Sequence, residues 1–132
     1  MNAENYLERI NKIDLLIRNR IEDHEKWVTI AEGLGGSSNS DGVQSSKNLH
    51  KSSDAIGKYV DIEREIYALR QERKAIIDNI EKLPNAEYSV IYALYVAGYT
   101  TKEVAFHFHK SYDWAKRNKK NGLAMIQSMI ND

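Results

Sequence analysis

Apolar side chains recur at intervals of three and four residues through two long segments of this 132-residue chain. Residues 6–28 carry one continuous apolar stripe, and residues 59–83 carry a strict heptad pattern in which Arg73 is the polar exception. A helix makes one turn in about 3.6 residues, so this spacing places the apolar side chains on one face. We therefore expect an all-α protein with two long amphipathic helices, over about 3–31 and 53–82.

Residues 33–53 separate these two segments and have a different composition. Four glycines and seven serines occur within the 21 residues GLGGSSNSDGVQSSKNLHKSS, which predicts a flexible loop. The segment Gly42–Ser46 inside it has two interpretations: a loop that clamps a partner, or a linker whose serines cap the next helix. The spacing also leaves open whether the two long helices pair with each other or with those of a second chain.

The only proline of the chain, Pro84, follows Leu83 and ends the second long segment, because proline cannot continue a helix. A shorter helix is expected over 85–97. Its apolar stripe is rich in tyrosine, which we interpret mainly as the core of a small helical domain, with a partner surface as the alternative. The sequence thus predicts a helical hairpin or coiled-coil-like region over 1–83 and a second domain over 84–132.

Residues 98–111 carry the signals of a short helix followed by a turn. Gly98 suits a left-handed helix end, and Thr100 with Glu103 has the spacing of a capping box. Val104, Ala105 and Phe108 are then expected to face inward. A turn at His109 and Lys110 leads to Ser111, which is a favourable N-cap for a second helix.

The second helix is expected to turn a polar and basic face outward. Residues 110–120 contain five Lys or Arg and one Asp, a net charge of +4, although the whole chain is neutral. A basic patch on one element is the footprint expected for a polyanionic partner such as DNA. The alternative is a solvated, lysine-rich helix face. The residues expected outward are Tyr112, Asp113, Lys116, Arg117 and Lys120.

From Leu83 to about Met129, the chain resembles the region-4-type helix-turn-helix of sigma factors. The matching elements are Leu83-Pro84, Val96-Ala97-Gly98-Tyr99, Thr100-Thr101-Lys102-Glu103-Val104-Ala105 and Ser111. The layout of the whole chain is also similar to small phage late-gene transcription activators of the RinA/ArpU type. Those proteins have a Gly-rich stretch that leads into a Val-x-Ser-Ser-like motif, and Gly42-Val43-Gln44-Ser45-Ser46 matches this feature. The chain departs from the usual helix-turn-helix pattern of this family at three positions. His109 stands in place of the turn glycine, Lys110 in place of an apolar turn residue, and Ala115 in place of a branched apolar core residue.

This resemblance implies a sequence-specific regulator of transcription, a phage or prophage late-gene activator, which binds double-stranded DNA. Host RNA polymerase is the further partner implied, and a homodimer is expected because one helix-turn-helix binds weakly. The expected DNA-binding residues are Thr100, Thr101, Lys110, Ser111, Tyr112, Asp113, Lys116, Arg117 and Lys120. The alternatives are a DNA-packaging subunit of the small-terminase kind and a protein–protein adaptor built on a sigma-like fold.

The sequence offers no set of residues for catalysis, a cofactor or a metal. Gly33, Gly35 and Gly36 lack the Gly-Lys-Ser/Thr of a phosphate loop, and His107 and His109 diverge without a third ligand. No apolar run is long enough for a membrane span, and residues 1–10 resemble neither a signal nor a transit peptide. The absence of cysteine fits a reducing compartment, so the expected location is the cytoplasm of a bacterial host.

Overall fold

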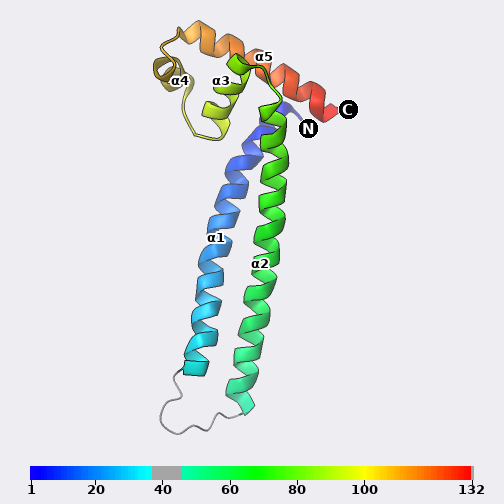
Figure 1. The fold of residues 1–132 in the computed structure, drawn as a ribbon, viewed down its shortest axis with the longest axis vertical. Coiled ribbons are helices and arrows are strands. Elements are labelled where there is room, and N and C mark those ends of the chain that lie inside the picture. Colours follow the sequence, from blue (N-terminus) through cyan, green and yellow to red (C-terminus); the bar gives the residue numbers. More distant parts are fainter. Residues whose placement is uncertain (37–45, 132) are drawn as a thin grey trace. The chain divides into compact units, whose positions relative to one another are not determined.

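The computed structural model describes residues 1–36 and 46–131, with side chains for 1–33 and 53–131, and within them it contains five α-helices and no strand (Figure 1). These are α1 (Ala3–Gly36), α2 (Ser46–Glu81), α3 (Asn85–Tyr95), α4 (Thr101–His107) and α5 (Tyr112–Asn131). The all-α prediction is confirmed. None of these helices, over the described residues, combines the length and the apolarity needed to span a lipid bilayer.

The two long helices extend further than the composition predicts. α1 continues to Gly36 and α2 begins at Ser46, so residues 33–36 and 46–53, which we expected in the loop, are helical. Adding residues to an existing helix costs far less than starting one, and therefore glycine and serine are tolerated at the ends of long helices. Residues 42–45 of the Gly42–Ser46 segment lie outside the described residues.

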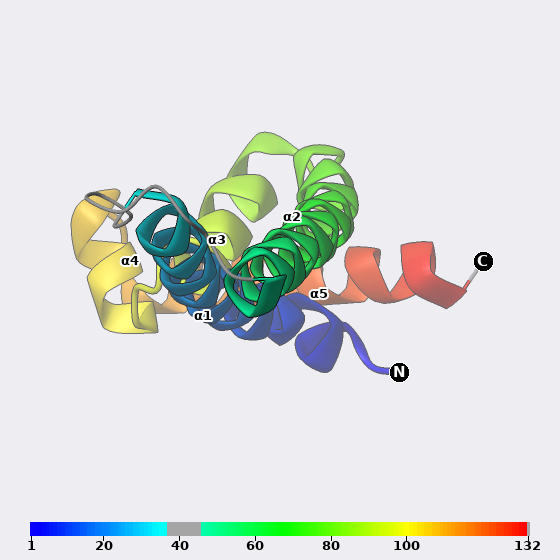
Figure 2. The ribbon, with the colours of Figure 1, turned by 90° about the horizontal axis from the view of Figure 1, so that it is seen from below.

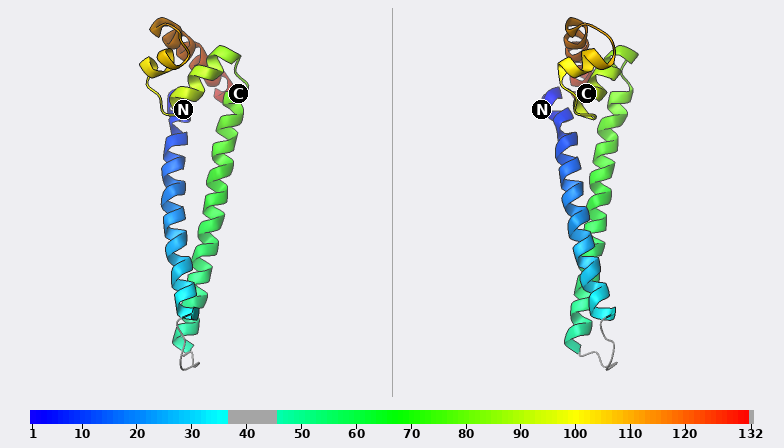
Figure 3. Two further views of the ribbon diagram at one scale, coloured as in Figure 1. Left: turned by 60° about the vertical axis from the view of Figure 1, so that its left-hand side comes forward. Right: turned by 90° about the vertical axis from the view of Figure 1, so that its left-hand side faces the viewer.

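Contacts divide the chain into two compact units, which we call the terminal unit (residues 1–14 and 71–132) and the middle unit (residues 15–70). This division does not coincide with the boundary at residue 83 expected from the sequence. In the middle unit, the segments of α1 and α2 run side by side and antiparallel in both side views of Figure 3. The same pair is seen nearly end-on in Figure 2.

Within each unit the two apolar seams pair inside one chain. In the terminal unit, Arg9 Nε lies 2.6 Å from Glu72 Oε2, and in the middle unit Arg20 Nε lies 2.6 Å from Glu65 Oε2. Both ion pairs join α1 to α2 and lie on the margins of the apolar stripes. The sequence left open whether the helices pair with each other or with a second chain, and these contacts show that they pair with each other.

The terminal unit holds the best-buried core. α5 packs against α3 and α4, and α3 also packs against α4. The buried side chains between them are Val90, Ala93, Val104, Ala105 and Ala115. Leu7, Ile10 and Ile13 from α1 are also fully buried, and the Ala3 backbone N–H donates to Gln127 Oε1 at 2.8 Å. The two ends of the described chain therefore lie in the same unit (Figure 1).

Candidate nucleic-acid interface

α4 begins at a capping box, as the sequence predicts. Thr100 Oγ1 accepts the Glu103 backbone N–H at 3.2 Å, and Glu103 Oε1 accepts the Thr100 N–H at 3.0 Å. The hydrogen bond from the Thr100 backbone holds the pKa of Glu103 below its ordinary value, because that N–H stabilises the ionised carboxylate. The start of this seven-residue helix is therefore fixed by reciprocal hydrogen bonds.

The turn after α4 passes through a left-handed residue. His109 has a φ of 56°, the only positive φ of a non-glycine residue among the described residues, and Gly98 before α4 has a φ of 83°. Lys110 N–H then donates to the Ala105 carbonyl at 2.9 Å, which closes the turn. His109 thus adopts the left-handed conformation, which histidine tolerates better than most non-glycine residues.

Ser111 caps α5, as its position predicts. Its Oγ accepts the Trp114 backbone N–H at 3.0 Å. On the inward side of α5, Ala115 is fully buried, and Asn118 is 7% exposed with its Nδ2 donating to the Trp114 carbonyl at 3.0 Å. The half-buried Trp114 packs against the core that contains Ala115. The inward face is therefore filled, which fixes the direction of the opposite face.

That opposite face is exposed. It consists of Tyr112, Asp113, Lys116, Arg117 and Lys120, which we call the outward face of α5. The orientation expected for all five residues is confirmed. Three cations and one carboxylate give this face a net charge of +2. The charge is concentrated in the first half of the helix, directly after the turn.

Two of the expected cations lie against aromatic rings. Lys110 Nζ is 5.8 Å from the centre of the Trp114 ring, and Lys116 Nζ is 5.8 Å from the centre of the Tyr112 ring. The quadrupole of an aromatic ring attracts a cation that lies over the ring face. These contacts orient two lysines beside the start of α5.

Lys119 is directed away from the outward face. Its Nζ lies 3.7 Å from Glu4 Oε1, and the same oxygen accepts a hydrogen bond from the Tyr95 hydroxyl at 3.4 Å. Burial of the Tyr95 hydroxyl raises its pKa, and the nearby Glu4 charge adds to the effect. One of the five cations counted from the sequence is therefore neutralised by a residue near the other end of the chain.

The expected threonines lie at the start of α4. Thr100 is exposed and Thr101 is half-buried, whereas the remaining candidates lie in the turn and in the first half of α5. The oxygens of Thr100 and Ser111 both accept backbone N–H groups. Each hydroxyl keeps its own proton for donation to an acceptor outside the protein, such as a phosphate oxygen.

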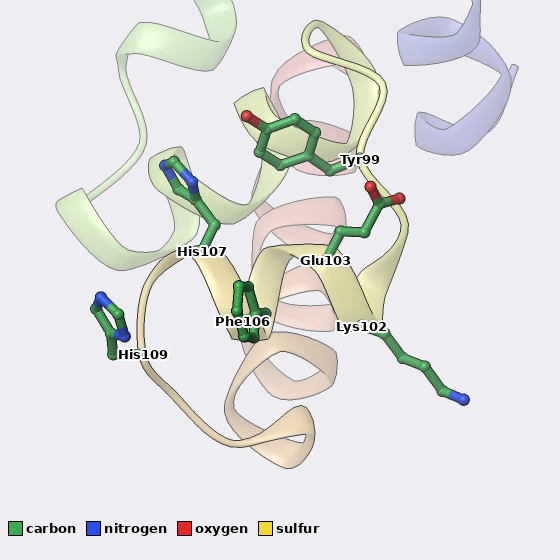
Figure 4. Close-up of a pocket in the computed structure, with 6 residues that line it drawn as sticks. All are labelled: Tyr99, Lys102, Glu103, Phe106, His107 and His109. Carbon is green, nitrogen blue, oxygen red and sulfur yellow. The ribbon is translucent and has the colours of Figure 1, made fainter.

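A hollow beside α4 was not expected from the sequence. It has a volume of about 640 Å³ and is lined by Tyr99, Lys102, Glu103, Phe106, His107 and His109 (Figure 4). Phe106 is 84% exposed. The Tyr99 and His107 rings pack edge to face, with 5.4 Å between their centres. The sequence does contain a signal for this exposure. If Val104, Ala105 and Phe108 face the core, helix geometry places Phe106 on the solvent side of α4.

Over the part of the chain that the structure describes, no three His, Cys, Asp or Glu side chains gather closely enough to hold a metal ion. Comparison of the chain with protein-family models, with curated proteins and with solved structures finds no significant match.

Proposed function

We propose that the chain is a sequence-specific DNA-binding regulator of transcription, of the phage or prophage late-gene activator kind, acting in the cytoplasm of a bacterial host. In this proposal α4 and α5 form a helix-turn-helix, and the first half of α5 enters the major groove. α4 would then cross the sugar–phosphate backbone.

One observation carries the proposal: the outward face of α5 is exposed, basic and held by a capped turn. Recognition helices present the residues of their N-terminal half to DNA, and these residues lie on such a face. The filled inward face supports the same function, since groove docking requires the exposed side chains to be held in place.

Each exposed residue has a proposed role. Arg117 and Lys116 would meet guanine or phosphate, and Lys120 would meet phosphate. Tyr112 would contact a phosphate or a base, and Asp113 would accept a hydrogen bond from a cytosine amino group. Thr100, Thr101, Ser111 and Lys110 would position the protein on the backbone, through their hydroxyl and ammonium protons.

A protein partner is favoured by the hollow beside α4. A largely exposed phenylalanine next to tyrosine and histidine rings is typical of protein-binding surfaces, in which aromatic side chains are enriched. We propose host RNA polymerase as this partner. We also propose a homodimer, because two linked reading units bind adjacent half-sites more tightly than one.

The test is DNA selected from a random pool by the full chain, followed by titration at several salt concentrations. Lys116→Ala with Arg117→Ala should weaken binding by roughly tenfold or more. If both side chains contact phosphates, the slope of log affinity against log salt should fall by about 1.8, since each contact contributes about 0.9.

The matched control is Lys12→Ala with Arg18→Ala, which removes the same charge from two exposed positions of α1. This variant should bind the selected DNA almost as well as the original chain. Equal affinity and equal salt slope in both double variants would exclude the docking through α5. If no DNA is selected, the alternative of a protein–protein adaptor is favoured. If the chain forms a large ring that protects a packaging site, it is a small-terminase subunit.

A further inference from the structure

The middle unit buries few of its apolar side chains. Among its described hydrophobic residues, only Ala55 and Ile66 are buried, at 1% and 9% exposure. Several residues of the apolar seams remain partly accessible: Ile17, Ile21, Val28, Ile62 and Leu69. Two helices that pack only against each other cover one side of each apolar stripe, which leaves its flanks open. The middle unit therefore retains apolar surface for a further packing partner.

One face of α2 combines this accessible surface with two opposite charges. Tyr67 is 67% exposed, Glu63 precedes it by four residues, and Arg70 follows it by three. Residues at these spacings are neighbours on a helix surface, so the three side chains form one patch, which we call the Tyr67 face. With His24 and Ile66 they line a hollow of about 310 Å³.

The charges of the Tyr67 face are available for a contact outside the chain. Arg70 is exposed and forms no ion pair with any residue in the described part of the chain. Glu63 is exposed, and its Oε1 lies 3.6 Å from the Nε2 of His24. The neighbouring Glu65 is already paired with Arg20, so it does not compete for an incoming cation.

We infer that two copies of the chain associate through their Tyr67 faces, with one α2 antiparallel to the other across a twofold axis near Tyr67. Glu63 and Arg70 are seven residues apart, which is about two turns or about 10.5 Å along the helix. A twofold axis midway between them places Glu63 of each copy opposite Arg70 of the other. A parallel arrangement in register would place like charges together, so the charges select the antiparallel one.

The composition of the face favours a second copy over DNA. One acid and one base give the Tyr67 face no net charge, so it has no attraction for a polyanion. In the antiparallel arrangement the exposed Tyr67 ring of each copy lies at the centre of the contact, beside the hollow of the other copy. Tyrosine at the centre of an interface is a frequent hot spot. The inference rests on the homodimer of the proposed function and is independent of DNA binding.

Sedimentation velocity of the full chain over a range of concentrations tests this contact. The unmodified chain should form a dimer, and Tyr67→Ala should raise its dissociation constant by roughly tenfold or more. Glu63→Arg should have a similar effect, because it sets two arginines against each other, and so should Arg70→Glu. The double variant Glu63→Arg with Arg70→Glu should restore the dimer, since opposite charges again meet.

Lys58→Glu is the matched control, because residue 58 is exposed and lies on the opposite side of α2 from Tyr67. It should leave the dissociation constant of the dimer unchanged, and circular dichroism should show full helicity for every variant.

Three outcomes would contradict the inference. A chain that stays monomeric at all concentrations would overturn the dimer. A dimer insensitive to Tyr67→Ala and to both charge reversals would overturn this surface, and reversals that the double variant fails to rescue would overturn the antiparallel pairing. Salt-dependent DNA binding, measured in parallel, tests the proposed function separately.

Discussion

At the scale of single residues, the turn between α4 and α5 depends on one backbone conformation. His109 has a φ of 56°, in the region that glycine adopts easily and branched side chains adopt rarely. Its side chain is exposed, so the backbone conformation is the main constraint on the identity of this residue. Gly98, with a φ of 83°, has the same constraint before α4.

Replacing His109 by valine should therefore destabilise the protein by about 1 to 2 kcal/mol, because a β-branched side chain is crowded in the left-handed region that histidine tolerates. His109→Gly is the matched control and should stay within about 1 kcal/mol of the original chain, because relief of strain offsets the greater freedom of the unfolded chain. Urea unfolding followed by circular dichroism measures both. Equal stability of the two variants would contradict the importance of this conformation.

At the scale of helices, α5 approaches α3 closely at a glycine. A Cβ atom built on Gly122 would lie 2.5 Å from Ile91 Cγ1 and 3.0 Å from Ile91 Cδ1. Ile91 is fully buried, so it has little room to move away. Gly57 in α2 differs, because a Cβ atom there would meet no atom within 4 Å.

Gly122→Ala should consequently lower the free energy of unfolding by about 1 to 3 kcal/mol, as expected for overpacking. Gly57→Ala should raise it by up to about 1 kcal/mol, since alanine favours the helix over glycine. Thermal or denaturant unfolding of the two variants provides the comparison. A Gly122→Ala variant at least as stable as the original chain would mean that the contact with Ile91 does not limit the position of α5.

At the scale of the whole molecule, the beginning of α1 belongs to the same unit as the candidate interface. Leu7, Ile10 and Ile13 are buried completely, and Glu4 binds Tyr95 and Lys119 of α3 and α5. The sequence places a domain boundary at residue 83, but the terminal unit draws its core from both sides of that position. The stability of α5 should depend on side chains near residue 7.

This dependence can be measured with the two tryptophans of the chain. In a Trp27→Phe background, the fluorescence of Trp114 reports on α5 alone. Leu7→Ala should lower the stability reported by Trp114 by about 2 to 5 kcal/mol, because it leaves a cavity in the core. Leu15→Ala, at a position 53% exposed, is the control and should cost about 1 kcal/mol or less. An unchanged Trp114 transition in Leu7→Ala would show that α5 is stable without α1.

The sequence by itself determined the helical class, the approximate position of each helix and the caps of α4 and α5. These features depend on residues three or four positions apart, such as Thr100 with Glu103, whose relative geometry is set by the helix backbone. The outward direction of Lys116 and Arg117 followed from the same periodicity. Their docking on DNA remains a prediction, because it depends on a partner.

The tertiary structure alone decided the features that join distant parts of the chain. Lys119 has the local pattern of an exposed cation, and only the fold brings Glu4 beside it. Likewise, a heptad seam records which side chains are apolar but not which surface covers them, so the pairing of α1 with α2 and the exposure of Tyr67 could not be read from spacing. The reason is physical: backbone geometry fixes local neighbours, whereas distant neighbours depend on how the whole core packs.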